Sequence, residues 1–464
     1  MSKKMGAARS VVKSENCLAL EKRLETCPTL FNGSGKKQRN RLFPSSKTSC
    51  LFLWQVLSAE RSCSEVVQAF LAWRADTRQA EASPNTAAYC GARKRLELSD
   101  LQNAQHTLGA HVAQQAQSDQ QWHGRRVVVV DGTGLSMPDT PANQKEYPQA
   151  ASSKPGCGFP QMKLVALFCL TTGALLRYAQ SHRKVGELTL FRGMWDALHS
   201  GDVVLADRGF CNFADYYRLG LRNIDSVMRL HQRRTKGLSL LKRFGPGDKL
   251  LNWHKSKPVP TGFTKEQWAA IPDTLTVRHV TFTHNIPGFR TKKITIATTL
   301  VDHKQFPAAT FAELYLRRWL VEIFLRDIKI TLGMDILRCK TPEMIQKELT
   351  MHLIAYNLIR LTMVQAALKA QRNVERISFK GTLQAVRQWG PRIDRAEEEK
   401  REQLYQSMLT AIGRVPIPNR PNRTEPRVKK RRAKNYQLMT KPRKEMKEAP
   451  HRSRYTKENR GQNA

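Results

Sequence analysis

Two aspartates of this chain stand where an α/β protein could carry metal-dependent phosphodiester chemistry. Asp131 and Asp207 each end a short apolar run, VVVVD and VVLAD, and a glycine follows each within two residues. If the two runs are neighbouring parallel strands, both carboxylates lie at the carboxyl edge of the sheet, where such proteins bind ligands. Asp202 opens its run and is expected at the other edge. A single strand-end aspartate is more often a turn or cap residue, so the inference depends on the pair.

A third carboxylate, Glu322, lies in the helix-like segment FAELYLRRWLVEIFLRDIK. At about 100° per residue, one narrow stripe of an α-helix would carry Tyr315, Arg318, Glu322 and Lys329. Apolar residues fill much of the opposite side, which predicts a substantially buried helix. The alternative is a surface ladder of ion pairs, because Arg318, Glu322 and Arg326 are four residues apart. Spacing alone leaves these two interpretations equal.

Convergence of the three acids would create a metal site of a particular kind. Carboxylates are the hard oxygen ligands that Mg²⁺ prefers. Two divalent ions about 4 Å apart can activate an attacking water or hydroxyl and neutralise charge on the leaving oxygen. The three acids would therefore suit an enzyme that cuts or transfers phosphodiester bonds.

The composition points to a polyanionic partner. The formal net charge of the 464-residue chain is +39, which favours nucleic acid. Solubility alone is the competing explanation, but the charge is locally concentrated: residues 414–464 hold seventeen Lys or Arg and four Glu. No apolar run approaches the roughly 18 residues of a membrane span, so no membrane association is expected. The nine cysteines are scattered without a CxxC pair, which favours reduced thiols in a cytoplasm over a zinc site.

The region before the first aspartate has helical patterns. Ser62 and Glu65 have capping-box spacing ahead of VVQAFLAW, and Ser83-Pro84 predicts a helix start before NTAAYCGARKRL. Two short helices in this order resemble a helix-turn-helix reader of DNA. An ordinary helical hairpin has the same pattern, so both interpretations stay open. The second helix would end in three basic residues that could contact DNA: Arg93, Lys94 and Arg95.

The helix segment carries the pattern that links the chain to a family. YLRRWLVEIFLRDIK matches Tyr-x2-Arg-x3-Glu-x6-Lys in full. This pattern resembles the signature of bacterial insertion-sequence transposases of the insertion-sequence-four family. VVVVDGTGLSMPDTPANQ and GDVVLADRGFCN resemble that family's first and second acid motifs. The resemblance runs from about Ser58 through PNRTEPRVKKRR, most of the chain, and implies a DDE transposase with a ribonuclease-H-like core.

The expected fold class is α/β, a ribonuclease-H-like mixed sheet with flanking helices. From RRVVVVDGTG onward, the order strand, hairpin, helix, strand, helix predicts mixed strand directions. Large β insertions before the glutamate occur in the family, which suits residues 229–300. The expected segments are a basic arm and helical DNA-end-binding domain (1–120), the first part of the catalytic core (121–228), the β-rich insertion (229–300), core helices carrying Glu322 (301–375), and a C-terminal helical segment with a basic tail (376–464).

The resemblance also implies roles for the three acids. Asp131, Asp207 and Glu322 would be catalytic and would hold two Mg²⁺ ions, with Mn²⁺ as a workable substitute. Asp131 would bridge both ions, while Asp207 and Glu322 would each hold one. Water would first cut at a transposon end, and the released 3′-hydroxyl would then attack the opposite strand or target DNA in a cut-and-paste reaction.

The other signature residues would bind DNA. Tyr315, Arg318 and Lys329 would hold phosphates near the cut end, since Arg offers a forked donor and Tyr a hydroxyl. Arg326 shares their stripe but lies outside the signature, so its contact with DNA is a weaker expectation. Trp253 and Trp268 are the local aromatics that could stack on a flipped base, although packing is the simpler role for each.

The expected partner is double-stranded DNA, both the inverted-repeat ends of a transposon and the target. A homodimer in the synaptic complex and a cytoplasmic location on the bacterial chromosome are also implied. Two alternatives remain open from the residues. One is a ribonuclease-H-like nuclease or resolvase that never joins strands, because a fold does not define a function. The other is a catalytically inactive derivative that only binds DNA.

Overall fold

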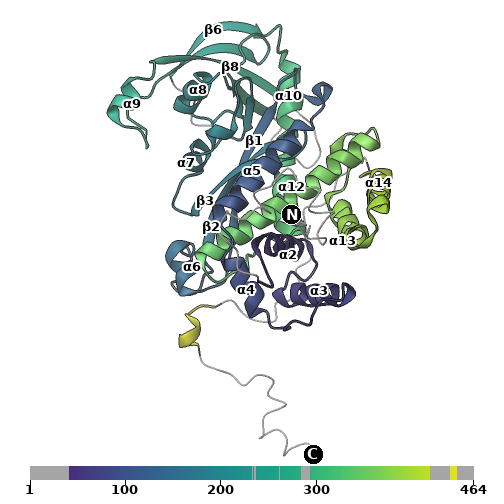
Figure 1. Ribbon diagram of the computed structural model, residues 1–464. Coiled ribbons are helices and arrows are strands. Elements are labelled where there is room, and N and C mark those ends of the chain that lie inside the picture. Colours follow the sequence, from purple (N-terminus) through teal and green to yellow (C-terminus); the bar gives the residue numbers. More distant parts are fainter. Residues whose placement is uncertain are drawn as a thin grey trace, which may run out of the picture.

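A computed structural model describes residues 41–231, 234, 237–260, 262–283, 293–418 and 439–446. The predicted basic arm before residue 41 and most of the predicted basic tail lie outside these residues. Two long helices, α5 (Leu98–Gln114) and α12 (Pro342–Lys369), lie side by side across one side of a twisted sheet (Figure 1). None of the helices within the described residues is long and apolar enough to cross a membrane.

The sheet contains nine strands in the order β3-β2-β1-β4-β5-β9-β8-β7-β6. β1, β4 and β5 are parallel neighbours, whereas the other neighbouring strands are antiparallel. A mixed sheet with flanking helices confirms the predicted α/β, ribonuclease-H-like class. The strands are β1 (Val127–Ser136), β2 (Gln161–Cys169), β3 (Leu175–His182), β4 (Val203–Ala206), β5 (Asp225–Arg229), β6 (Leu238–Gly245), β7 (Asp248–His254), β8 (Thr274–Thr283) and β9 (Lys293–Thr298).

The apolar run before Asp131 forms a central strand because both of its faces are covered. The four valines Val127–Val130 are at most 2% exposed, and β-branched side chains fit such a pleated, packed surface. The predicted order is also observed, since the β2–β3 hairpin and α7 come between β1 and β4, and α8 follows β4. One expectation was wrong: β1 does not end at Asp131 but continues to Ser136, paired with β2.

The region 229–300 is rich in strands, as expected, and it extends the central sheet. β9 returns to pair antiparallel with β5, and β8, β7 and β6 then continue outward in that order. In Figure 1 these strands lie at the top of the molecule. A buried ion pair stabilises this part: Arg278 Nη2 on β8 lies 2.6 Å from Asp248 Oδ2 on β7, and the Arg278 side chain is fully buried.

The helix expected to carry all four signature residues is interrupted. α10 ends at Arg317 and α11 begins at Leu320. Between them the backbone tightens, because the N–H groups of Arg318 and Glu322 donate to carbonyls three residues earlier. A π-helix over Asp327–Thr331 then widens the last turn. These two departures from regular α geometry change where the side chains of the stripe point.

Other helices surround the sheet. The N-terminal helices α2, α3 and α4 have a small apolar core of their own, which includes Phe43, Phe70 and Tyr89. Ser62 caps α3 as expected, whereas α4 begins at Ala87, three residues later than Ser83-Pro84 predicted. The remaining α-helices are α2 (Ser45–Leu57), α3 (Cys63–Asp76), α4 (Ala87–Lys94), α6 (Pro141–Glu146), α7 (Glu187–Arg192), α8 (Phe213–Gly220), α9 (Lys265–Ala269), α10 (Ala308–Arg317), α11 (Leu320–Arg326), α13 (Phe379–Arg395) and α14 (Glu398–Arg414).

Candidate active site

The two aspartates lie at the same level of two parallel strands. β1 and β4 pair in the register Val127–Val203, Val128–Val204 and Val129–Leu205. Asp131 and Asp207 each follow the last of these pairs by two residues, so they sit next to each other where β4 ends. Asp131 Oδ1 accepts a hydrogen bond from the Gly132 N–H at 2.8 Å. Asp207 Oδ1 accepts one from the Gly209 N–H at 2.7 Å. The glycine after each acid therefore helps to orient the carboxylate.

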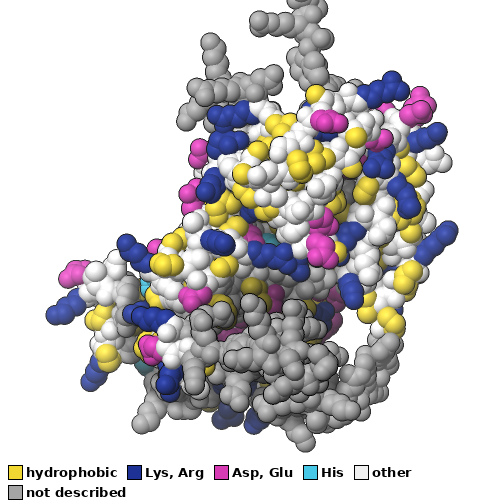
Figure 2. All heavy atoms as spheres, turned by 90° about the horizontal axis from the view of Figure 1, so that it is seen from below, with side chains coloured by type: hydrophobic (Ala, Val, Ile, Leu, Met, Phe, Trp, Pro, Cys, Tyr) yellow, Lys and Arg dark blue, Asp and Glu magenta, His cyan; other side chains and the backbone are white. Residues whose placement is uncertain are grey.

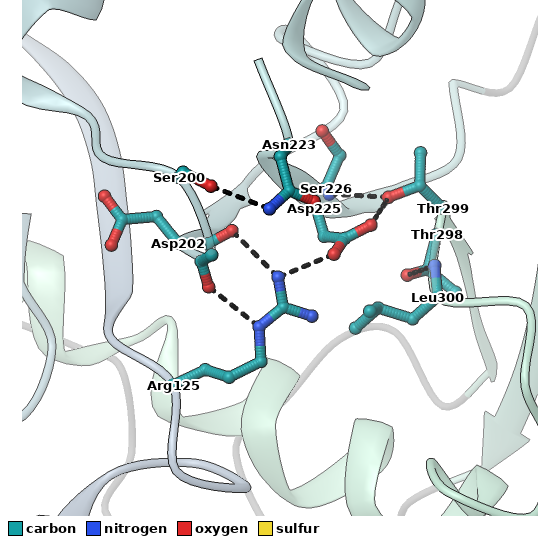
Figure 3. Close-up of polar contacts among 10 residues, drawn as sticks. Arg125, Ser200, Asp202, Asn223, Asp225, Ser226, Thr298, Thr299 and Leu300 are labelled. Atoms are coloured by element: carbon teal, nitrogen blue, oxygen red, sulfur yellow. Dashed lines mark hydrogen bonds and ion pairs between the residues drawn. The ribbon is translucent and has the colours of Figure 1, made fainter. Parts of the chain in front are cut away.

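Asp202 belongs to the opposite edge of the sheet, as the sequence indicated. Arg126 Nε donates to Asp202 Oδ1 at 2.9 Å. The adjacent Arg125 donates through Nη2 to Asp225 Oδ2 at 2.6 Å and through Nε to the Gly201 carbonyl at 2.8 Å. Figure 3 shows the Arg125 guanidinium between Asp225 and the backbone at Asp202. These ion pairs join the beginnings of the three parallel strands and give Asp202 and Asp225 one arginine each.

Glu322 reaches the aspartates through a shared arginine. Arg318 Nη2 donates to Glu322 Oε1 at 2.9 Å, and Arg318 Nη1 lies 3.8 Å from Asp131 Oδ2. The guanidinium is mostly buried, with 18% of its side chain exposed, while Glu322 is 43% exposed. Arg318 therefore lies between an acid on β1 and an acid on α11, and it compensates charge on both.

The electrostatics of Asp131 reflect this grouping. Its pKa is raised to about 6, first by burial, and the negative charges of Asp207 and Glu322 act in the same direction. The Gly132 N–H and the Arg318 guanidinium oppose the rise in pKa. The negative charges of Asp207 and Glu322 thus both act on Asp131. Carboxylates arranged to bind a cation are expected to repel one another in this way when no cation is bound.

Tyr315 and Lys329 approach the site from either end of the interrupted helix. Tyr315 is 7% exposed, its ring lies 6.0 Å from the Arg318 guanidinium carbon, and burial raises its pKa. Lys329 lies in the π-helix, where its Nζ donates to Thr133 Oγ1 at 3.1 Å and to the Gly134 carbonyl at 2.9 Å. The widened turn thus directs Lys329 to β1 just beyond Asp131.

Arg326 has a different position from the other stripe residues. Its guanidinium lies 3.6 Å from the carboxylate of its neighbour Asp327, and its side chain is 62% exposed. The ladder of ion pairs considered from the sequence is thus only partly present, because Arg318 pairs with Glu322 but Arg326 pairs with Asp327. Arg326 is available to solvent or to a ligand.

The three basic residues of α4 do not share one environment. The Arg93 side chain is buried and donates to the thiols of Cys63 and Cys339. Lys94 and Arg95 are exposed. Contact with DNA from this helix therefore depends on Lys94 and Arg95, because the Arg93 guanidinium faces the protein interior.

Both aromatics considered for base stacking pack inside the protein. Trp253 is fully buried on β7, and its indole N–H donates to His279 Nε2 at 2.8 Å. Trp268 is 5% exposed and packs edge-on against Phe213 and Phe263. The simpler packing role fits both residues.

A feature that the motifs gave no reason to expect is Glu187, the first residue of α7. A Cβ atom added at Gly132 would lie 2.7 Å from Glu187 Oε1, so this carboxylate rests against the backbone next to Asp131. The glycine in the DGTG motif is the one signal that could have indicated a close neighbour there.

The donor chemistry of the site fits a divalent ion. Within the described residues, no group of three or more His, Cys, Asp or Glu side chains is close enough together to hold a metal. Asp131 nevertheless senses the charge of both other acids, and carboxylate oxygens are suitable hard ligands. Asp131 and Asp207 lie at one edge of the sheet, and Arg318 lies between Asp131 and Glu322 of α11.

Acids at the carboxyl edge of parallel strands lie where α/β proteins bind ligands, and they could hold the divalent ions that phosphodiester chemistry uses. Comparison with known proteins identifies the class of enzyme. The model of the transposase DDE domain family matches residues 122–358, and the chain belongs to this family. It is a DNA transposase that depends on a divalent metal.

A relative of known function agrees with this assignment. The transposase InsG for insertion sequence element IS4 of Escherichia coli (strain K12) is 28% identical over 355 residues, covering 74% of this chain and 76% of that protein. The predicted membership of the insertion-sequence-four family is thereby confirmed. Among solved structures, the piggyBac transposase synaptic complex with hairpin DNA is 8% identical, with a TM-score of 0.42 over 89% of this chain and 84% of that one.

Proposed function

We propose that this transposase cuts DNA at the inverted-repeat ends of its transposon and joins the released 3′ end to target DNA. The observation that supports this most directly is the shared register of Asp131 and Asp207, with Glu322 linked to them through Arg318. Hydrolysis would supply the 3′-hydroxyl, and the same acids would serve its attack on a second phosphodiester. A hairpin on the opposite strand is one route between these steps.

Asp131, Asp207 and Glu322 would hold two Mg²⁺ ions, and Mn²⁺ could replace them. Bound there, the ions would lower the pKa of an attacking water and neutralise charge on the leaving oxygen. Asp131 is the central ligand in this proposal, since it lies between β4 and α11 and experiences both other carboxylates. Because the pKa of Asp131 is about 6, protons would compete with the metal ion for this carboxylate below that pH.

Arg318 has to exchange partners before Glu322 can act as a ligand. In its present position the guanidinium donates to Glu322 and lies near Asp131. A DNA phosphate offers the same pair of oxygen acceptors that a carboxylate does, so it could take over the Arg318 donors. Arrival of the cut end would then release Glu322, and Arg318 would hold the phosphate in line for attack.

Tyr315 and Lys329 would complete the grip on the DNA end. The Tyr315 hydroxyl lies in the part of the site that Arg318 also occupies, and a phenol can donate to a phosphate. Lys329 Nζ uses acceptors on β1 and could add a phosphate as a third partner, because an ammonium has three donors. Arg326, which is largely exposed, would contact the backbone further along the duplex.

DNA outside the site would be bound by basic surface residues. Lys94 and Arg95 of α4 are proposed contacts to the transposon end. Figure 2 shows Lys and Arg side chains spread over the face that carries the N-terminal helices, with fewer acidic side chains beside them. The segments proposed above from the sequence, 1–120, 121–228, 229–300, 301–375 and 376–464, would divide end binding from catalysis. A homodimer would join two ends, in a cytoplasm and on the bacterial chromosome.

The experiment that tests this function uses a duplex carrying the inverted repeat that flanks the gene. The full chain is incubated with this DNA and Mg²⁺, and products are resolved as nicked, double-cut and joined species. Joined products support the proposal. Cutting without joining would instead favour a ribonuclease-H-like nuclease or resolvase, and a mobility shift without cutting would favour an inactive DNA-binding derivative. A chelator serves as the control for metal dependence.

A further inference from the structure

A cavity away from the carboxylates is lined by an unusual number of cations. It has a volume of about 180 Å³, well above the roughly 10–15 Å³ that a single buried water needs. It lies between the N-terminal helices α2–α4 on one side and the chain that follows the catalytic helices on the other. Arg61, Arg93 and Arg338 line it, together with Cys63, Cys339 and His352.

The three arginines that line the cavity have no carboxylate within ion-pair distance in the described part of the chain. Among the described residues, no carboxylate forms an ion pair with Arg61, Arg93 or Arg338. By contrast, the fully buried Arg278 pairs with Asp248. Arg93 is buried, Arg61 is half-buried and Arg338 is exposed. A buried charge without an opposite charge is costly, so the Arg93 guanidinium would be stabilised by an anion in this space, where Arg61 and Arg338 supply further donors.

Arg93 shows the lack of strong hydrogen-bond acceptors most clearly. It is 6% exposed, and its Nη1 and Nη2 donate only to the sulfur atoms of Cys63 and Cys339, each at 3.1 Å. Thiol sulfur is a weak acceptor. The Arg93 Nε has no hydrogen-bond partner, and the stacking of the guanidinium over the Phe52 ring at 4.0 Å offsets only part of the cost.

Two further groups at the cavity have unused polar atoms. Arg61 Nη1 donates to the Leu332 carbonyl at 2.6 Å, but its Nε has no partner. His352 is 4% exposed and its Nδ1 has no partner. Arg338 uses Nη1 for the Glu60 carbonyl at 2.8 Å. Burial and then the positive charge of Arg338 lower the pKa of Arg61, whereas the more weakly acting carboxylates of Asp335, Glu348 and Glu60 oppose this shift.

The acid that also lines the cavity is already engaged. Glu348 accepts hydrogen bonds from the backbone N–H groups of Arg338 and Cys339, at distances of 2.9–3.0 Å. Its carboxylate therefore fixes the turn before α12, and although its charge acts on Arg61 and Arg93, it forms no ion pair with either. The lining retains an excess of positive charge and of donors.

We propose that this cavity binds a phosphate group, held by the guanidinium groups of Arg61, Arg93 and Arg338. A tetrahedral oxyanion presents several acceptors, and forked guanidinium donors match them. The group could be free inorganic phosphate or a backbone phosphate of bound DNA. The second source depends on the proposed DNA-cutting function, whereas phosphate binding itself does not.

The position of the cavity gives such binding a consequence for the active site. The segment 332–339, which forms one wall, also pairs with the end of β1: Ser136 N–H donates to the Asp335 carbonyl, and Leu337 N–H donates to the Ser136 carbonyl. β1 is the strand that carries Asp131. A phosphate that ties the N-terminal helices to this segment would therefore stabilise the far end of the catalytic strand.

The first test is a calorimetric titration of the full chain with inorganic phosphate in a chloride buffer. Arg338→Gln should weaken binding by about tenfold or more, because a hydrogen bond to a charged group is lost. Arg395→Gln is the matched control, since Arg395 is on α13 with 69% of its side chain exposed and lies outside the cavity. No binding by the wild type, or equal binding by all three proteins, would overturn the proposal.

A second variant tests the site without removing an arginine. Ser62 lines the cavity and caps α3 by accepting from the Glu65 N–H, a role that Asp also performs. Ser62→Asp should supply the missing carboxylate, so phosphate binding is lost while the melting temperature without phosphate rises. Ser378→Asp, at the equivalent cap of α13, measures the effect of the cap substitution alone. Unchanged phosphate binding by Ser62→Asp would contradict the proposal.

A short duplex of arbitrary sequence then distinguishes the two sources of phosphate. If DNA displaces inorganic phosphate from the wild type, and Ser62→Asp binds DNA less tightly, the ligand is a backbone phosphate. If phosphate binds equally well with DNA present, the ligand is the free anion. Both results keep the cavity as a phosphate site. None of these measurements requires cleavage, so a failure of end cutting would leave this test intact.

Discussion

The two ends of the parallel strands β1 and β4 carry acidic residues in opposite circumstances. At the amino end, Asp202 and Asp225 each have an arginine within hydrogen-bond distance, so charge is matched one to one. At the carboxyl end, Asp131 experiences two other acids and shares a single arginine with Glu322. Paired charges stabilise the register of the strands. Excess like charge is unfavourable for folding, and its presence indicates a site that receives cations.

The largest expected effect is the loss of DNA cleavage when an acid of the candidate active site is replaced. Replacing Asp131, Asp207 or Glu322 by Ala should reduce end cleavage many-thousandfold, because in the proposed mechanism these carboxylates would hold the ions that stabilise charge in the transition state. Binding to end DNA should be nearly unchanged. Single-turnover cleavage and a mobility-shift assay measure the two properties. Near-normal cutting by Glu322→Ala would remove α11 from the site.

The next effect concerns the shared arginine. Arg318→Ala should slow hairpin formation and joining by roughly a hundredfold and slow the first nick less, since small misplacements of reacting atoms are costly. Arg318→Lys should restore only part of the rate, because Lys lacks the planar fork. A time course that resolves nicked, double-cut and joined products checks both variants. If all steps slow equally, Arg318 is not a phosphate clamp and its ion pair with Glu322 is structural.

The ion pairs at the amino end of the strands should affect stability and not catalysis. Asp202→Ala should lower the free energy of unfolding by about 2–3 kcal/mol, because it leaves Arg126 without its partner. The loss stays below the value for a fully buried pair because 21% of the Arg126 side chain is exposed. Urea denaturation measures it. Cleavage per folded molecule should be unchanged, and a large loss of catalytic rate would mean that this edge also contributes to the reaction.

The smallest expected effect is on how the stability of the metal-free protein depends on pH. Because the pKa of Asp131 is raised to about 6, the folded protein favours its protonated form. The metal-free protein should therefore gain stability as pH falls from about 6 toward the unfolded value of about 4, and lose it as pH rises through 6. Glu322→Gln should lower this pKa by removing a negative charge. Carboxyl NMR in a chelator follows the titration, and an unmoved midpoint would separate Glu322 from Asp131.

The amino-acid sequence was sufficient to predict where the aspartates lie relative to the strands. The runs ending in Asp131 and Asp207 predicted two buried strands, because β-branched residues fit a covered, pleated surface. Their equivalent positions then predicted neighbouring carboxylates, and the β1–β4 register places them so. The position of Asp202 at the other edge followed from the same reasoning, since it precedes its strand. The local pattern was sufficient here because parallel strands run in the same direction. Residues that follow them lie at one edge of the sheet, and residues that precede them lie at the other.

Only the tertiary structure decided which partners the side chains of the helix residues contact. A regular helix would put Tyr315, Arg318 and Lys329 on one stripe, but the tightened turn at Arg318 and the π-helix at Lys329 redistribute them. The acceptors that Lys329 then reaches are on β1, 196 residues away in the chain in the case of Thr133. The burial of Arg93 was equally hidden, because Cys339, one of its two partners, comes from 246 residues downstream. Sequence spacing reports local geometry, whereas a side chain's partners depend on what the fold brings against it.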